Sequence, residues 1–115
     1  MKDDLAYLKY IAEGIERIEQ YTAEGKEAFF TNSMIQDATI RRLQTLAEST
    51  QRLSEELKAR ETEIDWRGIS GLRNILVHDY LGGIDLDIIW DVIERNLPEL
   101  KGKVEAILQE LKGEE

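Results

Sequence analysis

The sequence predicts an all-α protein, an up-and-down bundle of four main helices with one short extra helix. Three observations point to this fold class. Leu, Ile, Ala, Glu, Lys and Arg, most of them good helix formers, dominate long stretches of the 115 residues. Apolar residues recur at three- and four-residue steps rather than at every second position. Only one proline interrupts the chain, whose length suits a single domain over residues 1–115.

The first two long helices follow from their caps and their apolar stripes. Asp3 or Asp4 is expected to cap the first helix. Its stripe comprises Leu5, Leu8, Ala12, Ile15, Ile18 and Thr22. Thr31-Asn32-Ser33 form the next cap, and the second long helix is predicted from Ser33 to about Lys58. Its stripe comprises Ile35, Thr39, Leu43, Leu46, Thr50, Leu53 and Leu57.

The second half of the chain contains the remaining predicted helices. A third long helix is predicted from Trp66 to Tyr80, where two glycines follow. Asp85 then caps another helix, and Pro98 suits the first turn of the last one. Trp66 and Trp90 each belong to an apolar stripe, so we expect them to pack in the core or at an interface.

Composition excludes several kinds of site. The chain has no cysteine for a disulfide or a thiolate ligand, and its one histidine, His78, rules out a multi-histidine metal site. No apolar run approaches the roughly 18 residues that a membrane helix needs. Met1-Lys2-Asp3-Asp4 lacks the basic-then-apolar order of a secretion signal. We therefore expect a cytoplasmic protein that uses no metal or cofactor and contacts no membrane.

Residues 67–80 divide into two faces when they are projected around a helix at about 100° per residue. One face is apolar, has Arg73 at its edge, and comprises Ile69, Leu72, Leu76 and Tyr80. The other face comprises Gly71, Asn74, Ile75 and His78. Glycine inside a helix costs about 1 kcal/mol relative to alanine, so Gly71 predicts the close approach of another backbone or of a ligand. A second copy of the chain, related by a two-fold axis, would fit there.

Arg73 and His78 lie five residues apart, which separates them by about 140° around an ideal helix. One helix alone therefore places them poorly for joint action on one ligand. Two chains that meet across a two-fold axis would bring both arginines and both histidines to one cleft. A helix that unwinds near His78 would also bring the two side chains closer.

The segment Arg73-Asn74-Ile75-Leu76-Val77-His78-Asp79-Tyr80 matches the R-N-x-x-x-H-x-Y form of the HEPN signature. With the preceding Trp66-Arg67 pair, the chain resembles HepT-like HEPN proteins from about Ser33 to Leu111. The resemblance implies a homodimeric HEPN helical bundle that is a metal-independent endoribonuclease, with Arg73 and His78 as its catalytic pair. Asn74, one turn before His78, would orient it or bind the substrate.

The resemblance also implies the toxin of a type VII HEPN/MNT toxin–antitoxin system. Its partner would be an MNT-type nucleotidyltransferase antitoxin that adds AMP to Tyr80, and its substrate would be a tRNA or an mRNA. The chemistry suits these residues, because imidazole exchanges protons near neutral pH and the planar guanidinium group matches phosphate oxygens.

The net charge of −9 opposes RNA binding, since affinity for a phosphate backbone depends mainly on Lys and Arg. A local cluster of basic residues would offset it, and the candidates are Arg41, Arg42, Arg52, Arg67 and Arg73. Whether the adjacent pair Arg41-Arg42 faces the motif does not follow from the sequence.

Plainer roles for the same residues stay open. His78 would also suit the capping of carbonyls at a helix end, and Arg73 would suit a surface ion pair. Two other classes of function are possible as well. One is a non-catalytic HEPN protein that binds a nucleotide or acts as a scaffold for a nucleotidyltransferase, and the other is a purely structural helical dimer.

Overall fold

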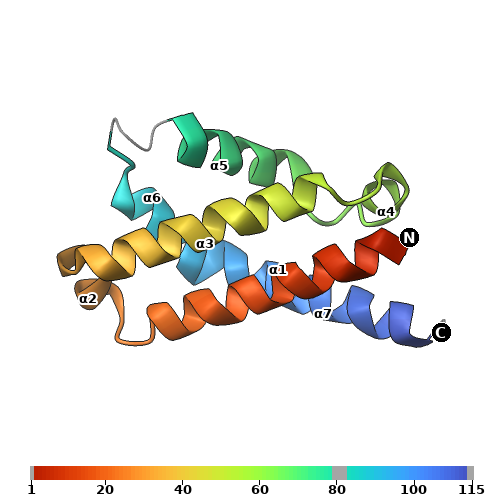
Figure 1. Cartoon of the computed structure of the whole chain (residues 1–115), viewed down its shortest axis with the longest axis horizontal. Coiled ribbons are helices and arrows are strands. Elements are labelled where there is room, and N and C mark those ends of the chain that lie inside the picture. Colours follow the sequence, from red (N-terminus) through yellow and green to blue (C-terminus); the bar gives the residue numbers. More distant parts are fainter. Residues whose placement is uncertain (1, 79–82, 114–115) are drawn as a thin grey trace.

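Four long helices run alternately up and down along the 45 Å length of the molecule (Figure 1). They are α1 (Lys2–Tyr21), α3 (Ser33–Gln51), α5 (Trp66–His78) and α7 (Leu97–Gly113). The computed structural model describes residues 2–78 and 83–113, and no strand occurs among them. Within these residues the connections contain α2 (Lys26–Thr31), α4 (Glu55–Arg60), α6 (Leu86–Asp91) and a π-helical turn (Val92–Asn96). The predicted all-helical bundle is confirmed, with three short helices where one was expected.

The hydrophobic core lies between the long helices and draws on them unequally. α1 contributes four side chains that are at most 1% exposed, Leu8, Ile11, Ile15 and Ile18. The corresponding buried positions in α3 and α7 include Leu43, Leu46, Val104 and Ile107. Each such side chain contributes about 1.5–3 kcal/mol relative to remaining exposed. α5 has only one buried residue, Leu76, so most of its surface is left outside the core. None of the described helices is both long and apolar enough to cross a membrane.

Asp4 is buried and joins α1 to the beginning of α4. α1 already includes Lys2, so neither Asp3 nor Asp4 caps it, and that prediction was wrong. Asp4 Oδ1 accepts a hydrogen bond from Ser54 N at 2.8 Å, and Asp4 Oδ2 accepts one from the Ser54 hydroxyl at 2.6 Å. Ser54 Oγ also accepts from Leu57 N at 3.1 Å and caps α4. Asp4 therefore stabilises a tertiary contact rather than its own helix end.

α3 ends at Gln51 and does not continue to Lys58 as predicted. Ser54 adopts an extended backbone (φ −65°, ψ 151°), which a continuous helix does not contain, and α4 begins after it. Leu53 and Leu57 are nevertheless both buried, at 3% and 0% exposure. The apolar stripe thus crosses the break, which is why periodicity predicted one long helix.

The predicted start of α5 is confirmed. Asp65 Oδ1 accepts a hydrogen bond from Gly68 N at 2.9 Å, and the helix begins at Trp66. A Cβ atom at Gly68 would overlap the Asp65 carboxylate, so a larger residue there would have to displace this capping side chain. Asn32 and Asp85 are caps as predicted, since each side chain accepts backbone N–H bonds from the first turn of its helix.

Pro98 lies in the first turn of α7, as predicted, directly after the π-helical turn. The Leu97 N–H donates to the Val92 carbonyl, five residues earlier. In an α-helix the proline ring clashes with the carbonyl four residues before it, and the wider π turn relieves that clash. α6, the π turn and α7 therefore form one continuous helical run from Leu86 to Gly113.

Candidate active site on helix α5

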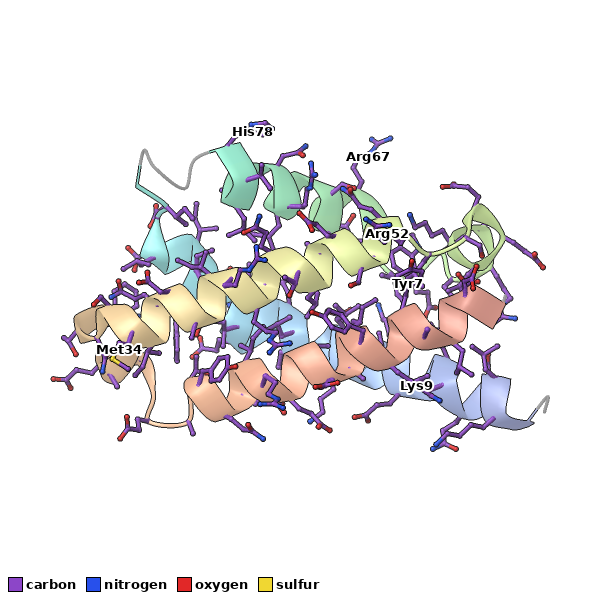
Figure 2. All side chains as sticks on the ribbon, viewed as in Figure 1. Tyr7, Lys9, Met34, Arg52, Arg67 and His78 are labelled. Atoms are coloured by element: carbon purple, nitrogen blue, oxygen red, sulfur yellow. The ribbon has the colours of Figure 1, made fainter. Side chains whose placement is uncertain are left out.

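α5 presents an exposed stripe on the side that faces away from the bundle. Its five residues, all exposed, are Arg67, Gly71, Asn74, Ile75 and His78. They fall within about 100° of one another around an ideal helix. Figure 2 shows the side chains of Arg67 and His78 projecting from α5 away from the other helices. The predicted division of this helix into two faces is confirmed, and we call these five residues the outer stripe.

Arg73 lies on a flank of α5, beside the outer stripe. It is half-buried, and its Nη1 donates to Asn74 Oδ1 at 3.4 Å. Ser70, one turn earlier on the same flank, accepts a hydrogen bond from Gln51 of α3 at 3.4 Å, so this flank faces α3. Arg73 Nε is buried with no hydrogen-bond partner among residues 2–78 and 83–113.

The donors of Arg73 are therefore only partly used within the described part of the chain. No carboxylate there forms an ion pair with it. A guanidinium group carries five N–H donors, and Arg73 uses one of them on the Asn74 side chain. The remaining donors suit an anionic ligand such as a phosphate.

Asn74 lies between Arg73 and His78 around the helix. It contacts Arg73 directly, and on the helix it lies about 40° from His78, one turn away. Arg73 and His78 themselves remain about 140° apart, so within one protomer the two side chains leave α5 in different directions. Tyr80, the predicted modification site, lies outside the described residues, as does Asp79.

The candidate arginines do not all lie on α5. Arg67 belongs to the outer stripe, and Arg52 is exposed at the end of α3. Arg41 and Arg42 line a groove between α1 and α3 instead. Of the five basic residues that the sequence suggested for RNA binding, only Arg67 and Arg73 lie on α5.

An apolar hollow of about 210 Å³ lies on the opposite flank of α5, between α3, α5 and α7. Gly68, Ile69 and Leu72 form the wall that α5 contributes. Sequence reasoning missed this hollow, because it depends on how three helices pack. It contains none of the predicted site residues.

A family model described as "Ribonuclease HepT-like" matches residues 11–107. The chain belongs to the HepT-like ribonuclease family. The match includes all of α5 of this HepT-like chain, and with it three residues of the predicted site, Arg73, Asn74 and His78. The resemblance found in the sequence is thereby confirmed.

Two similar proteins are aligned with most of this chain. The "Probable ribonuclease HepT" of Thermococcus cleftensis is 36% identical over 102 residues, which cover 88% of this chain and 92% of that protein. A "Putative RNase" of Caldanaerobacter subterraneus subsp. tengcongensis is 32% identical over 113 residues, 97% of this chain and 100% of that protein. At the level of the family, these names describe RNA-cleaving enzymes.

A longer relative contains the HepT-like region as one part. The "Gamma-glutamylcyclotransferase and putative RNase" of Methanocaldococcus jannaschii is 38% identical over 111 residues, 96% of this chain. The aligned region spans only 50% of that protein. No solved structure matches this chain.

Proposed function

We propose that this chain is the toxin of a type VII HEPN/MNT toxin–antitoxin pair, a cytoplasmic endoribonuclease in which Arg73 and His78 act together without a metal. One observation carries the proposal: α5 presents an exposed His78 at the end of the outer stripe and, on its flank, the Arg73 guanidinium group, which has a buried donor unsatisfied by any described residue. Membership of the HepT-like family supports the same reaction class.

In this proposal a second copy of the chain completes the site by packing against the outer stripe. Apart from the backbone of α5 itself, no heavy atom of residues 2–78 and 83–113 lies within 4 Å of the place where a Cβ would stand at Gly71, so nothing in that part of the protomer requires glycine there. Ile75 is 36% exposed on the same face. An exposed apolar side chain next to a gap suits close packing against an identical face. Such a dimer would bring Arg73 of one chain towards His78 of the other.

The proposed reaction uses the RNA itself as the nucleophile. The 2′-hydroxyl oxygen attacks the adjacent phosphorus, and the bond from phosphorus to the 5′ oxygen breaks. The products are a 2′,3′-cyclic phosphate and a 5′-hydroxyl. His78 of each Arg/His pair takes the 2′-hydroxyl proton as a base while water protonates the leaving 5′ oxygen, or it protonates that oxygen as an acid while water takes the 2′-hydroxyl proton. Arg73 binds the phosphate oxygens on which negative charge develops.

Incubation of the purified chain with tRNA and mRNA in EDTA tests this proposal. The wild type should cleave RNA, and His78→Ala should lower the rate by about 100-fold or more, as expected when an acid–base group is removed. The helical circular dichroism should not change, because His78 is exposed. Arg95→Ala, a change at an exposed arginine of the π turn, is the control. Undiminished cleavage by His78→Ala would favour the non-catalytic HEPN alternative.

We further propose that a nucleotidyltransferase antitoxin silences the toxin at Tyr80. The phenolic oxygen would bond to the α-phosphorus of ATP, pyrophosphate would leave, and the phenolic proton would be released. The added AMP places bulk and negative charge two residues beyond His78. Mass spectrometry after mixing with the partner and ATP should find AMP on the peptide that contains Tyr80. Persistence of this modification in Tyr80→Phe would contradict the assignment.

A further inference from the structure

A groove between α1 and α3 collects positive charge on this acidic protein. It has a volume of about 320 Å³ and is lined by Tyr10, Tyr21, Ala38, Arg41, Arg42 and Thr45. None of these six residues is acidic, although the chain contains 24 acidic residues. Among residues 2–78 and 83–113, no carboxylate forms an ion pair with either arginine. The two guanidinium groups are therefore a local positive site.

The packing of α1 against α3 builds this groove. Gly14 is buried, and a Cβ there would lie 3.5 Å from Leu46 Cδ1 and 3.7 Å from Arg42 Cδ. The stem of Arg42 therefore packs beside α1 at Gly14, where a Cβ would make only ordinary van der Waals contacts. Tyr10 and Tyr21 are eleven residues apart, which places them within about 20° of each other around α1. One hollow therefore has two phenol rings from α1 and two guanidinium groups from α3 on its walls.

We propose that this groove binds the phosphate and base of one nucleotide in a single-stranded RNA substrate. The choice of RNA as the ligand rests on the proposed function. The groove would be a second contact with that RNA, outside the outer stripe. The planar guanidinium groups match phosphate oxygens, and phenol rings provide a surface on which an unpaired base stacks. The volume lies near the lower end of the range of about 300–1,000 Å³ that is typical of small-ligand sites.

The groove is placed where a bound strand can reach the outer stripe. It lies in the half of the bundle where α1 ends and α3 begins, and α5 runs towards that same end (Figure 1). The whole molecule is 45 Å long. The substrate is single-stranded in this arrangement because base pairing would keep the base away from the phenol rings. Arg41 and Arg42 thereby supply RNA affinity that a net charge of −9 would otherwise oppose.

A binding measurement on an uncleavable RNA tests the groove independently of catalysis. The probe is a fluorescent 2′-O-methyl oligoribonucleotide of about 16 nucleotides, long enough for a typical single-strand site. It lacks the nucleophilic hydroxyl, so anisotropy reports binding alone. The double variant Arg41→Gln/Arg42→Gln should bind more weakly. For this variant, the logarithm of the association constant should fall less steeply with the logarithm of the salt concentration. The slope should be shallower by about 0.7 for each phosphate that the variant no longer neutralises.

Three further variants separate the groove from a general charge effect. Arg41→Lys/Arg42→Lys keeps both charges and should preserve the salt slope. Arg95→Gln removes an exposed positive charge that does not line the groove and should leave binding unchanged. Tyr10→Leu, which keeps an apolar side chain at this 40% exposed position, should weaken binding about 5-fold or more, because leucine offers no ring on which a base can stack.

Any of three results would overturn the inference. One is equal affinity of the wild type and the double glutamine variant for the oligonucleotide. Another is an equal loss of affinity in Arg95→Gln. Tight binding of free AMP that the oligonucleotide does not displace would also overturn it, because the ligand would then be a mononucleotide. None of these results bears on His78-dependent cleavage, so the two proposals fail separately.

Discussion

Asp4 holds the beginning of α1 against Ser54, 50 positions further along the chain. Its carboxylate accepts from both the backbone N–H and the hydroxyl of Ser54, and it is only 2% exposed. A buried polar group that loses its partner keeps the full cost of its desolvation. The contact therefore matters more to stability than an exposed cap would.

Replacement of Asp4 by alanine should lower the free energy of unfolding by about 1–3 kcal/mol, because it leaves Ser54 N–H without its acceptor. Urea denaturation followed by circular dichroism measures this. Asp3→Ala is the matched control. Asp3 is exposed in the same first turn, and its replacement removes the same charge from the helix end. Equal effects of the two substitutions would show that charge at the helix end, and not the Ser54 contact, stabilises the protein.

At the scale of the helices, apolar periodicity predicted where the four long segments lie but not every place where they break. Side-chain caps at Asn32 and Asp85 have local partners, so the sequence was enough to predict them. The break before α4 depends on Asp4, a residue far away in sequence, and the apolar stripe gives no sign of it because Leu53 and Leu57 are both buried.

At the candidate site on α5, too, local features were predictable from the sequence, whereas features that depend on distant residues were not. Helical projection correctly predicted that Asn74 and His78 are exposed and that Arg73 lies at the edge of the apolar face. The buried Nε of Arg73 depends on packing against α3 and had no local signal. The groove at Arg41 and Arg42 also required the structure, although the eleven-residue spacing of Tyr10 and Tyr21 on one side of α1 is a signal that the sequence contained.

Gly71 gives a direct test of the outer stripe as a dimer interface. Gly71→Leu should raise the stability of the protomer by up to about 1 kcal/mol, because leucine is the better helix former and meets open space. It should also convert the dimer to a monomer in analytical ultracentrifugation, since the added side chain blocks close approach.

Gly102 provides the matched control for that experiment. It is an exposed helical glycine of α7 that likewise has nothing within 4 Å of a Cβ. Gly102→Leu should therefore gain similar helix stability and remain dimeric. A Gly71→Leu protein that stays dimeric would place the interface elsewhere.

On the scale of the whole molecule, burial is unequal among the long helices, and the proposed site lies on α5, which buries the fewest side chains. α1, α3 and α7 each bury several apolar side chains, whereas α5 buries only Leu76 and exposes the stripe that contains Asn74 and His78. Basic side chains lie on two separate surfaces, the α1–α3 groove and α5. They offset the negative net charge of the chain locally, where RNA is proposed to bind. Within one protomer Arg73 and His78 diverge around α5, so the proposed active site requires side chains from two chains.

Mixing two inactive variants measures that requirement most directly. Arg73→Ala and His78→Ala homodimers should each fail to cleave RNA in EDTA, whereas subunit exchange between them should restore activity. A mixed dimer keeps one arginine and one histidine on opposite chains, and random pairing makes about half of the dimers mixed. We therefore expect roughly a quarter of the wild-type rate, since each mixed dimer retains one of two pairs. A fully exchanged mixture as inactive as either variant alone would contradict an active site shared between subunits.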